Sequence, residues 1–316
     1  MSKKKNKKNK SNLNKGNFKS GGKITIGMVP PSESMYLHQL KQKEQLIERF
    51  TNSDFKAISD DEIRSNLTVI LSYDNGNGAY FMPMNVPTHE IPIDSLLFRI
   101  RTIDSSIKCE NDLWCPPSKY ISKRGRLNDI NESVLYVTGD IGTALGEMRI
   151  EVGQEFYLLF YKVINTIGLI DISPSKGINS KYKEVEGIVS TFLVDEFSTL
   201  VPDNENERYR VSNMIGKFFY NYQKNEFDGW RYPSAVRSSK KSIAIDTKKC
   251  KEKLKFLYIA KGKLETETNY TLEQPKVLNK LEDKLYLLSE LVKTGDIEQY
   301  DINMIKEINT IWSNWG

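Results

Sequence analysis

The chain has 316 residues, of which 39% are hydrophobic and 10% aromatic, so it can bury a substantial core in one large domain or two small ones. Residues 1–23 hold nine lysines and no acidic residue, whereas the remaining 293 residues carry 37 basic and 41 acidic residues, a balance of −4. The basic charge therefore belongs to the tail, and the body is not expected to be a nucleic-acid-binding surface.

The composition of residues 1–23 predicts a disordered, lysine-rich tail, because it offers almost no apolar surface to bury. Such a tail makes at most weak, nonspecific contact with nucleic acid or an anionic surface, and a merely solvated tail is the simpler alternative. The longest apolar runs, such as FYLLFY at 156–161, are too short to span a membrane. No apolar stretch follows the lysines, so no secretory signal is expected. Three cysteines without a CxxC pair predict free thiols in a reducing, cytoplasmic compartment.

Residues 24–89 are predicted to form a helical N-terminal extension. Apolar residues at helical spacing indicate one helix over 34–50 and a second over Asp60–Leu71, with Ser59 as the N-cap of the second. The run YDNGNGAYF at 73–81 is typical of a turn. The next apolar run, LLFRIRTI at 96–103, predicts a strand.

The central part alternates strands with helices. A strand over 133–139 leads into a helix over 141–152 with Asp140 as its N-cap. Further strands are predicted over 156–164, 168–172, 243–246 and 255–263, further helices over 183–200 and 205–224, and a turn over 227–230. Because several of these strands can pair antiparallel, the pattern favours an α+β fold. After Pro275 the spacing predicts a C-terminal helical hairpin within 263–316, with helices over 277–292 and 302–312.

Three polar residues between 123 and 150 are candidates for a functional site. Arg126 lies in a tight Gly-Arg-x-Asn loop, Tyr136 lies on the predicted strand, and Glu147 lies on the flank of the predicted helix. Since neighbours in a strand point to opposite faces, Tyr136 faces a cleft if Leu135 and Val137 face the core with the helix. Taken singly, an Arg in such a loop is usually a surface ion pair, a strand Tyr is usually packing, and a helix Glu is usually solvated.

The spacing of these residues resembles that of RES domains, a family named for an Arg, a Glu and a Ser. The chain has GRLN, LY and TALGE in order, with ten residues from Arg126 to Tyr136 and eleven from Tyr136 to Glu147. A later DGWRYPS at 228–234 resembles the family's DGxxYPS segment and supplies Ser234, while FRIRT at 98–102 and WCPP at 114–117 resemble its upstream motifs. The resemblance covers residues 90–262, which we expect to be a RES domain. Residues 235–246 depart from the family because they lack its Gly-Gly-x-Asn turn.

The resemblance implies a fold similar to ADP-ribosyltransferase toxins, with mixed or antiparallel sheets and flanking helices, here with helical N- and C-terminal additions. It also implies an enzyme that consumes NAD by hydrolysis or phosphorolysis of the nicotinamide–ribose bond, and in many members a toxin neutralised by a small antitoxin protein. This chain is longer than a small-domain toxin. Transfer of ADP-ribose to a protein target is one alternative, and a noncatalytic nucleotide-binding module is an alternative of a different class. The oligomeric state stays open.

The resemblance also implies roles for individual residues. Glu147 would stabilise the positive charge that develops on the ribose, and Arg126, helped by Arg99, would hold the pyrophosphate. Tyr136 would stack on nicotinamide or donate its hydroxyl, and Ser234 would bond the ribose or the nicotinamide amide. Two further motif residues, Asn128 and Tyr232, are expected to contact NAD. No metal is expected, since Cys109 and Cys115 have no histidine close by in sequence.

Overall fold

The computed structural model describes residues 33–74, 80–81, 87–103, 107, 109–173, 183–202, 204–223, 226–279, 284–287 and 310. The predicted tail at 1–23 and most of the predicted helix at 302–312 lie outside these residues.

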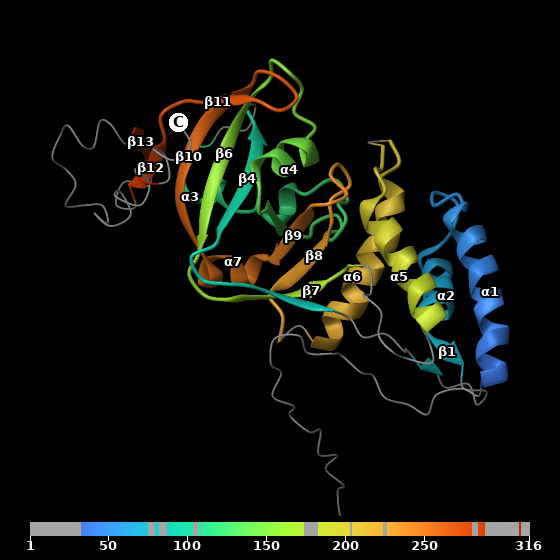
Figure 1. Ribbon diagram of the computed structural model, residues 1–316. Helices are drawn as coiled ribbons and strands as arrows, with labels where there is room; N and C mark the ends of the chain where they lie inside the picture. Colours follow the sequence, from blue (N-terminus) through green and yellow to red (C-terminus); the bar gives the residue numbers. More distant parts are fainter. Residues whose placement is uncertain are drawn as a thin grey trace, which may run out of the picture.

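The described part of the chain is an α+β fold built on one large sheet, as the alternation of strands and helices predicted (Figure 1). The strand order is β13-β12-β10-β6-β4-β5-β9-β8-β7-β3, with β11 paired to β10, and every pair is antiparallel except β7 with β8. The strands are β3 (Thr88–Ile91), β4 (Leu96–Thr102), β5 (Val134–Thr138), β6 (Glu155–Val163), β7 (Ile167–Asp171), β8 (Gly229–Pro233), β9 (Lys241–Asp246), β10 (Leu254–Leu264), β11 (Tyr270–Leu272), β12 (Lys276–Asn279) and β13 (Lys284–Leu287). A separate pair joins β1 (Tyr73–Asp74) to β2 (Tyr80–Phe81).

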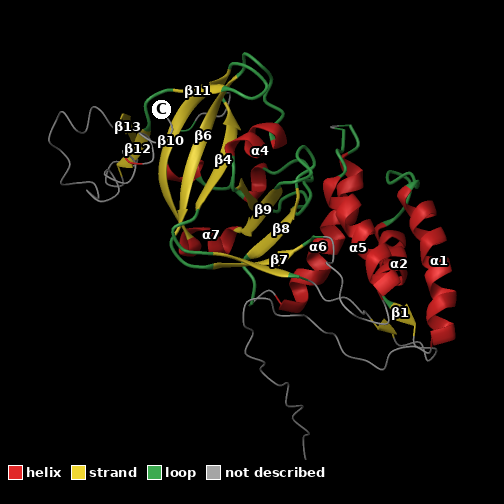
Figure 2. Ribbon diagram, viewed as in Figure 1, coloured by secondary structure: helices red, strands yellow, loops and turns green. Residues whose placement is uncertain are grey.

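Four of the helices gather on one side of the molecule, and Figure 2 shows them as a group beside the strands. They are α1 (Glu33–Thr51), α2 (Asp60–Leu71), α5 (Lys183–Ser198) and α6 (Tyr209–Gln223). The shorter helices are α3 (Glu110–Leu113), α4 (Ile141–Glu147) and α7 (Thr247–Lys253), with 3₁₀ turns η1 (Ser118–Tyr120) and η2 (Asn206–Arg208).

The core consists of three apolar clusters. The first joins the four grouped helices to β7, β8 and β9, so the N-terminal extension shares its core with the domain that follows. The second lies between α4 and strands β4, β6 and β10. The third packs β4, β5, β6 and β9 against α3 and α7. Each cluster therefore depends on segments that are distant in the sequence.

The large sheet narrows between β4 and β5. These strands pair at a single position, Phe98 with Thr138, whereas β4 and β6 pair over seven positions, Leu96–Thr102. The sheet therefore divides into a half containing β4, β6 and β10 and a half containing β5, β9, β8 and β7. Helix α4 packs on β4 and β5, beside this junction (Figure 1).

Capping signals in the sequence located two helix starts correctly. Helix α2 spans Asp60–Leu71 as predicted, and the Ser59 side chain accepts a hydrogen bond from the Glu62 backbone N–H. The Asp140 side chain accepts from the Thr143 backbone N–H and caps α4. Both side chains satisfy backbone donors that the first helical turn leaves unpaired.

The predicted extent of the helix at 141–152 is wrong, because α4 ends at Glu147. Arg149 takes a positive φ of 51°, which a continuing helix does not allow. Met148 and Val152, which a helix over 141–152 would place on its apolar face, are 43% and 57% exposed. Leu135 and Val137 also belong to a different core cluster from α4, so they do not face the core together with that helix.

The predicted helix over 277–292 is wrong where the structure describes it, because β12 and β13 form an antiparallel hairpin beside β10. Val277 packs into the second cluster and its neighbour Leu278 into the third, so adjacent side chains enter opposite faces of the sheet. Pairing with the sheet edge overrides a helical spacing of leucines. The remainder of this predicted helix lies outside the described residues.

Candidate active site

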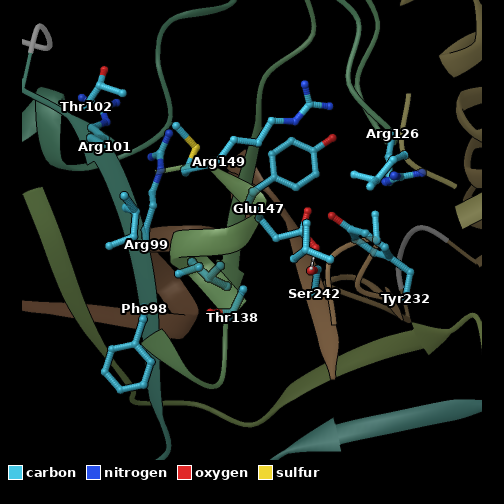
Figure 3. A pocket seen from close by; sticks show the side chains of 18 of the residues that line it. Phe98, Arg99, Arg101, Thr102, Arg126, Thr138, Glu147, Arg149, Tyr232 and Ser242 are labelled. Atoms are coloured by element: carbon cyan, nitrogen blue, oxygen red, sulfur yellow. Dashed lines mark hydrogen bonds between the residues drawn. The ribbon is translucent and has the colours of Figure 1, made fainter. Parts of the chain in front are cut away.

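A cavity of about 580 Å³ lies where the two halves of the large sheet part. Its walls come from strands β4 and β5, helix α4, the end of β8 and the start of β9. The loop that carries Arg126 and the first residue of α6, Tyr209, complete them. Figure 3 shows Glu147 near the middle of the lining residues, with Arg126 and Tyr232 on one side and Arg99 and Arg101 on the other. The volume falls within the range of about 300–1,000 Å³ that is common for small-molecule sites.

Glu147 is the last residue of α4, and its carboxylate is fixed through one oxygen. Oε1 accepts hydrogen bonds from the Ser234 hydroxyl at 2.6 Å and from the Ser242 hydroxyl at 2.8 Å, the second of which is drawn in Figure 3. Among the described residues, none donates a hydrogen bond to Oε2. The carboxylate is thus oriented by hydroxyl groups on one side and keeps an acceptor oxygen for a ligand on the other.

Ser234 is 1% exposed and follows β8 directly. Its hydroxyl oxygen lies 3.3 Å from the backbone N–H groups of Val236 and Arg237, so it accepts from them while it donates to Glu147. Ser234 does not line the cavity itself. Its place in the structure is behind the carboxylate, which it positions, rather than against a ligand.

Ser242 lines the cavity and was missed by the sequence analysis. It lies on β9, where it pairs with Tyr232 on β8 and with Thr138 on β5. Its position therefore follows from the register of three strands. Neighbouring side chains on a strand point to opposite faces, and Ile243 is buried in the core. The apolar Ile243 beside Ser242 was therefore the signal in the sequence that could have placed the Ser242 side chain on the cavity face.

Arg126 lines the cavity, but its guanidinium is bound to the end of α5. Nη1 donates to the Glu196 carbonyl at 3.2 Å and Nη2 to the Thr199 carbonyl at 2.5 Å. The guanidinium also lies 5.5 Å from the centre of the Tyr209 ring. Carbonyls at a helix C-terminus lack intrahelical partners and carry partial negative charge, so a buried cation is stabilised there.

Tyr136 presents its ring to the cavity while its hydroxyl holds the Arg126 loop. The hydroxyl accepts from the Leu127 backbone N–H at 2.9 Å and donates to Asn128 Oδ1 at 2.9 Å. Burial raises the pKa of Tyr136, so this proton stays in place at neutral pH. A Cβ at Gly125 would lie 2.4 Å from Asn128 Oδ1, which explains the glycine there. Asn128 is buried in the loop and does not line the cavity.

Tyr232 is 3% exposed, lines the cavity from β8, and packs against Phe197 with ring centres 5.8 Å apart. Burial raises the pKa of Tyr232 well above its usual value. The two tyrosines 136 and 232 therefore offer neutral aromatic surface beside the carboxylate of Glu147.

On the opposite wall, Arg99 and Arg101 share one backbone acceptor. Arg99 Nη1 lies 2.7 Å and Arg101 Nη2 3.1 Å from the Trp114 carbonyl oxygen. Burial lowers the pKa of Arg101 to about 10, and the charge of Arg99 acts in the same direction. Arg101 therefore still carries positive charge at neutral pH.

The lining residues give the cavity a strong excess of positive charge. They include four arginines, Arg99, Arg101, Arg126 and Arg149, and one acidic residue, Glu147. Guanidinium groups pair with phosphate oxygens through charge and parallel hydrogen bonds. The arrangement can therefore bind an anionic ligand and place one carboxylate against it.

The structure brings five of the seven predicted site residues to one cavity, namely Arg99, Arg126, Tyr136, Glu147 and Tyr232. The other two, Ser234 and Asn128, hydrogen-bond to members of that set. Within the described ranges, no helix is both long and apolar enough to cross a membrane. No three His, Cys, Asp or Glu side chains in those ranges group as ligands for a metal ion.

Neither a scan against protein-family models nor a search of the curated proteins gave a match for this chain.

Proposed function

We propose that this protein is a RES-type enzyme that cleaves the nicotinamide–ribose bond of NAD, as a glycohydrolase or a phosphorylase. One observation carries the proposal. A carboxylate oriented by two serine hydroxyls, Glu147, lies in a cavity whose other charged lining residues are four arginines. NAD combines a pyrophosphate, which requires cations, with a glycosidic bond, which breaks more easily beside a fixed anion.

The reaction places specific demands on Glu147. When the bond between ribose C1′ and the nicotinamide nitrogen breaks, its electrons leave with nicotinamide and positive charge builds on the ribose. The Oε2 atom of Glu147, to which no described residue donates a hydrogen bond, stabilises that charge or accepts a hydrogen bond from a ribose hydroxyl. Water or phosphate then supplies an oxygen to C1′ and loses a proton. Ser234 and Ser242 keep the carboxylate from rotating away during these steps.

Three of the four arginines divide into two groups in this proposal. Arg126 is held by the carbonyls of Glu196 and Thr199, so it acts as a fixed positive charge at the cavity wall. Arg99 and Arg101 each donate a hydrogen bond from one nitrogen to the Trp114 carbonyl. A guanidinium has five N–H donors, so both retain others for the pyrophosphate. We assign the phosphate contacts to this second group.

The aromatic contacts are divided in a similar way. The Tyr136 hydroxyl is engaged with Leu127 and Asn128, so its ring is the part that remains for nicotinamide. The Tyr232 ring is the second candidate on the same side of the cavity. A flat ring between aromatic side chains gains contact area at little cost in conformational entropy.

The experiment is to incubate the purified full chain with NAD, with and without inorganic phosphate, and to follow free nicotinamide. Release without phosphate indicates hydrolysis, and release that requires phosphate indicates phosphorolysis. Adding cell extract and labelled NAD distinguishes ADP-ribose transfer, because the label then appears on a macromolecule. No release under any of these conditions, by folded protein that binds NAD, would contradict the proposal and favour a noncatalytic nucleotide-binding module.

The resemblance to toxins with small antitoxin partners extends the proposal to growth inhibition. Inducing the chain in a host cell is expected to lower cellular NAD and arrest growth, whereas a Glu147→Gln chain at the same level is expected to do neither. Growth arrest by both chains would separate the toxicity from NAD cleavage.

A further inference from the structure

Two segments that are distant in the sequence, α3 with the residues after it and α7, lie against each other on the third core cluster. Lys251 Nζ on α7 lies 2.9 Å from Glu110 Oε1 on α3 and 5.8 Å from the centre of the Trp114 ring. Cys115 follows Trp114 directly, and Cys250 precedes Lys251 directly. The ion pair and the cation–ring contact therefore hold the two cysteines in the same small region.

Cys115 and Cys250 are neighbours at the third cluster, which contains Cys250 and has Cys115 packed against it, and each side chain acts on the pKa of the other. The Cys250 Sγ atom also lies 3.4 Å from the Asp246 carbonyl oxygen. Both are free thiols, but their surroundings differ, since Cys250 is 1% exposed and Cys115 is only half-buried. An external reagent therefore reaches Cys115 more readily than Cys250.

The chemistry of the two thiols is also unequal. The hydrogen bond from Cys250 lowers the pKa of Cys115, and the Ser133 hydroxyl and the positive charge of Arg99 act in the same direction, although burial opposes them. The hydrogen bond with Cys115 and burial raise the pKa of Cys250. The thiolate is the reactive form of cysteine, so Cys115 is the nucleophile of the pair and Cys250 its protonated neighbour.

We propose that Cys115 and Cys250 are a redox-active pair that hydroperoxides convert into a reversible disulfide. In the first step the Cys115 thiolate attacks a peroxide oxygen, the O–O bond breaks, and Cys115 becomes a sulfenic acid. The other peroxide oxygen leaves as RO⁻ and takes a proton from solvent to become alcohol or water. In the second step the Cys250 sulfur attacks the Cys115 sulfur. The S–S bond forms, the S–O bond breaks, and the hydroxyl leaves as water with the Cys250 proton. A dithiol reductant reverses the oxidation.

The position of the pair connects it to the cavity. The Trp114 carbonyl, one residue before Cys115, holds both Arg99 and Arg101. A disulfide would fix this carbonyl to α7 and thereby restrict the segment that positions the two arginines. The oxidation itself depends only on the thiols and is independent of the proposed NAD cleavage.

Cys109 is an internal control in the same chain. It precedes α3, and its S–H group donates a hydrogen bond to Asp112 Oδ2 at 3.3 Å. We expect brief treatment of the reduced full chain with stoichiometric hydrogen peroxide, followed by alkylation and peptide mass spectrometry, to show a Cys115–Cys250 link and an alkylated Cys109. Without oxidant, iodoacetamide is expected to modify Cys115 at least about 10-fold faster than Cys109.

The variants separate the two steps. Cys250→Ser is expected to trap the sulfenic acid at Cys115, where dimedone labels it, and Cys115→Ser is expected to abolish both label and disulfide. Cys109→Ser is expected to behave as the unchanged chain does. Disulfide formation is expected to raise Tm by at least about 3 °C, lost again on reduction. If all three cysteines of the unchanged chain are alkylated equally after peroxide, or Cys109 oxidises first, the proposal is wrong.

Discussion

The carboxylate of Glu147 and the guanidinium of Arg126, which line the same cavity, are held in opposite ways. Glu147 is bound by two side-chain hydroxyls through one oxygen, and no described residue bonds the other oxygen. Arg126 is bound by backbone carbonyls at the end of α5 and is 7% exposed. The first arrangement orients a group toward a ligand, whereas the second joins the site to the helical layer. Loss of Glu147 should therefore affect chemistry, and loss of Arg126 should affect the fold as well.

The sharpest test of this comparison is Glu147→Gln. The amide keeps the size of the side chain and an acceptor oxygen for the serines but removes the negative charge. We expect nicotinamide release from NAD to fall at least about 100-fold, the range found when a transition-state charge partner is removed, with Tm nearly unchanged. Glu151→Gln, the same change at an exposed position on the same segment, is the control and should retain full activity. Unchanged turnover in Glu147→Gln would remove the assigned role.

Arg126→Ala should give the opposite pattern. It leaves the Glu196 and Thr199 carbonyls without a buried partner, so we expect the free energy of unfolding to fall by about 3 kcal/mol, together with a loss of activity. Denaturant unfolding measures the change. Arg64→Ala, at a side chain that is 70% exposed in its pair with Asp61, should cost less than about 1 kcal/mol. Equal small costs for both variants would show that Arg126 does not stabilise the helical layer.

The two serines behind the carboxylate can be distinguished from each other. Ser242→Ala removes one hydrogen bond to Glu147, whereas Ser234→Ala also removes the acceptor for the Val236 and Arg237 backbone N–H groups. We expect kcat to fall about 10-fold in Ser242→Ala and further in Ser234→Ala. Only Ser234→Ala should also lower Tm. Full activity in a variant that carries both Ser234→Ala and Ser242→Ala would show that the Glu147 carboxylate does not need the two serine hydrogen bonds.

Lys43 provides a second example of a cation held at a helix end. Its Nζ donates to the Val69, Ile70 and Ser72 carbonyls at the end of α2, and burial lowers the pKa of Lys43 to about 7. Above that pH the unfolded chain binds more protons than the folded chain, since the pKa of a lysine in the unfolded chain is about 10.4. Stability therefore rises with pH through this window.

The measurement is the free energy of unfolding at pH 7 and pH 8. Relative to Lys43→Met, the unchanged chain should gain about 1 kcal/mol over this interval, because a full difference of one proton is worth about 1.4 kcal/mol per pH unit. Lys41→Met, on the exposed face of α1, should follow the unchanged chain. Parallel curves for the unchanged chain and Lys43→Met would show that Lys43 does not titrate in this range.

Local signals in the sequence were sufficient for much of the fold. Helix α2 with its Ser59 cap, and strands β4 and β6, follow from capping residues and short apolar runs. Strand β8 was read as a turn followed by a motif, and α7 was not predicted, since TKKCKEK has no apolar period. The prediction of a helix in place of the hairpin of β12 and β13 was wrong for a different reason. The leucines of this segment fit both a helix and a strand, and only the pairing of β12 with β10 decides for the strand.

The site was predictable in part for the same physical reasons. The resemblance to RES-domain spacing selected Arg126, Tyr136 and Glu147 as candidates, because one loop, strand and helix in succession carry them. Ser242 reaches Glu147 only through the register of β9 with β8 and β5, which no local pattern specifies. Donation of the Tyr136 hydroxyl to a ligand was one of the two roles expected for this residue, but the hydroxyl donates to Asn128, a contact that depends on how the loop closes.

The central claim, that NAD binds in this cavity with its scissile bond at Glu147, is tested most directly by a crystal structure of the Glu147→Gln protein with NAD. The substitution should leave binding intact and prevent turnover. We predict the ribose C1′ within about 3.5 Å of the side-chain oxygen of residue 147, the nicotinamide beside Tyr136, and the pyrophosphate against Arg99 and Arg101. NAD bound outside the cavity, or with its pyrophosphate against residue 147, would contradict the account.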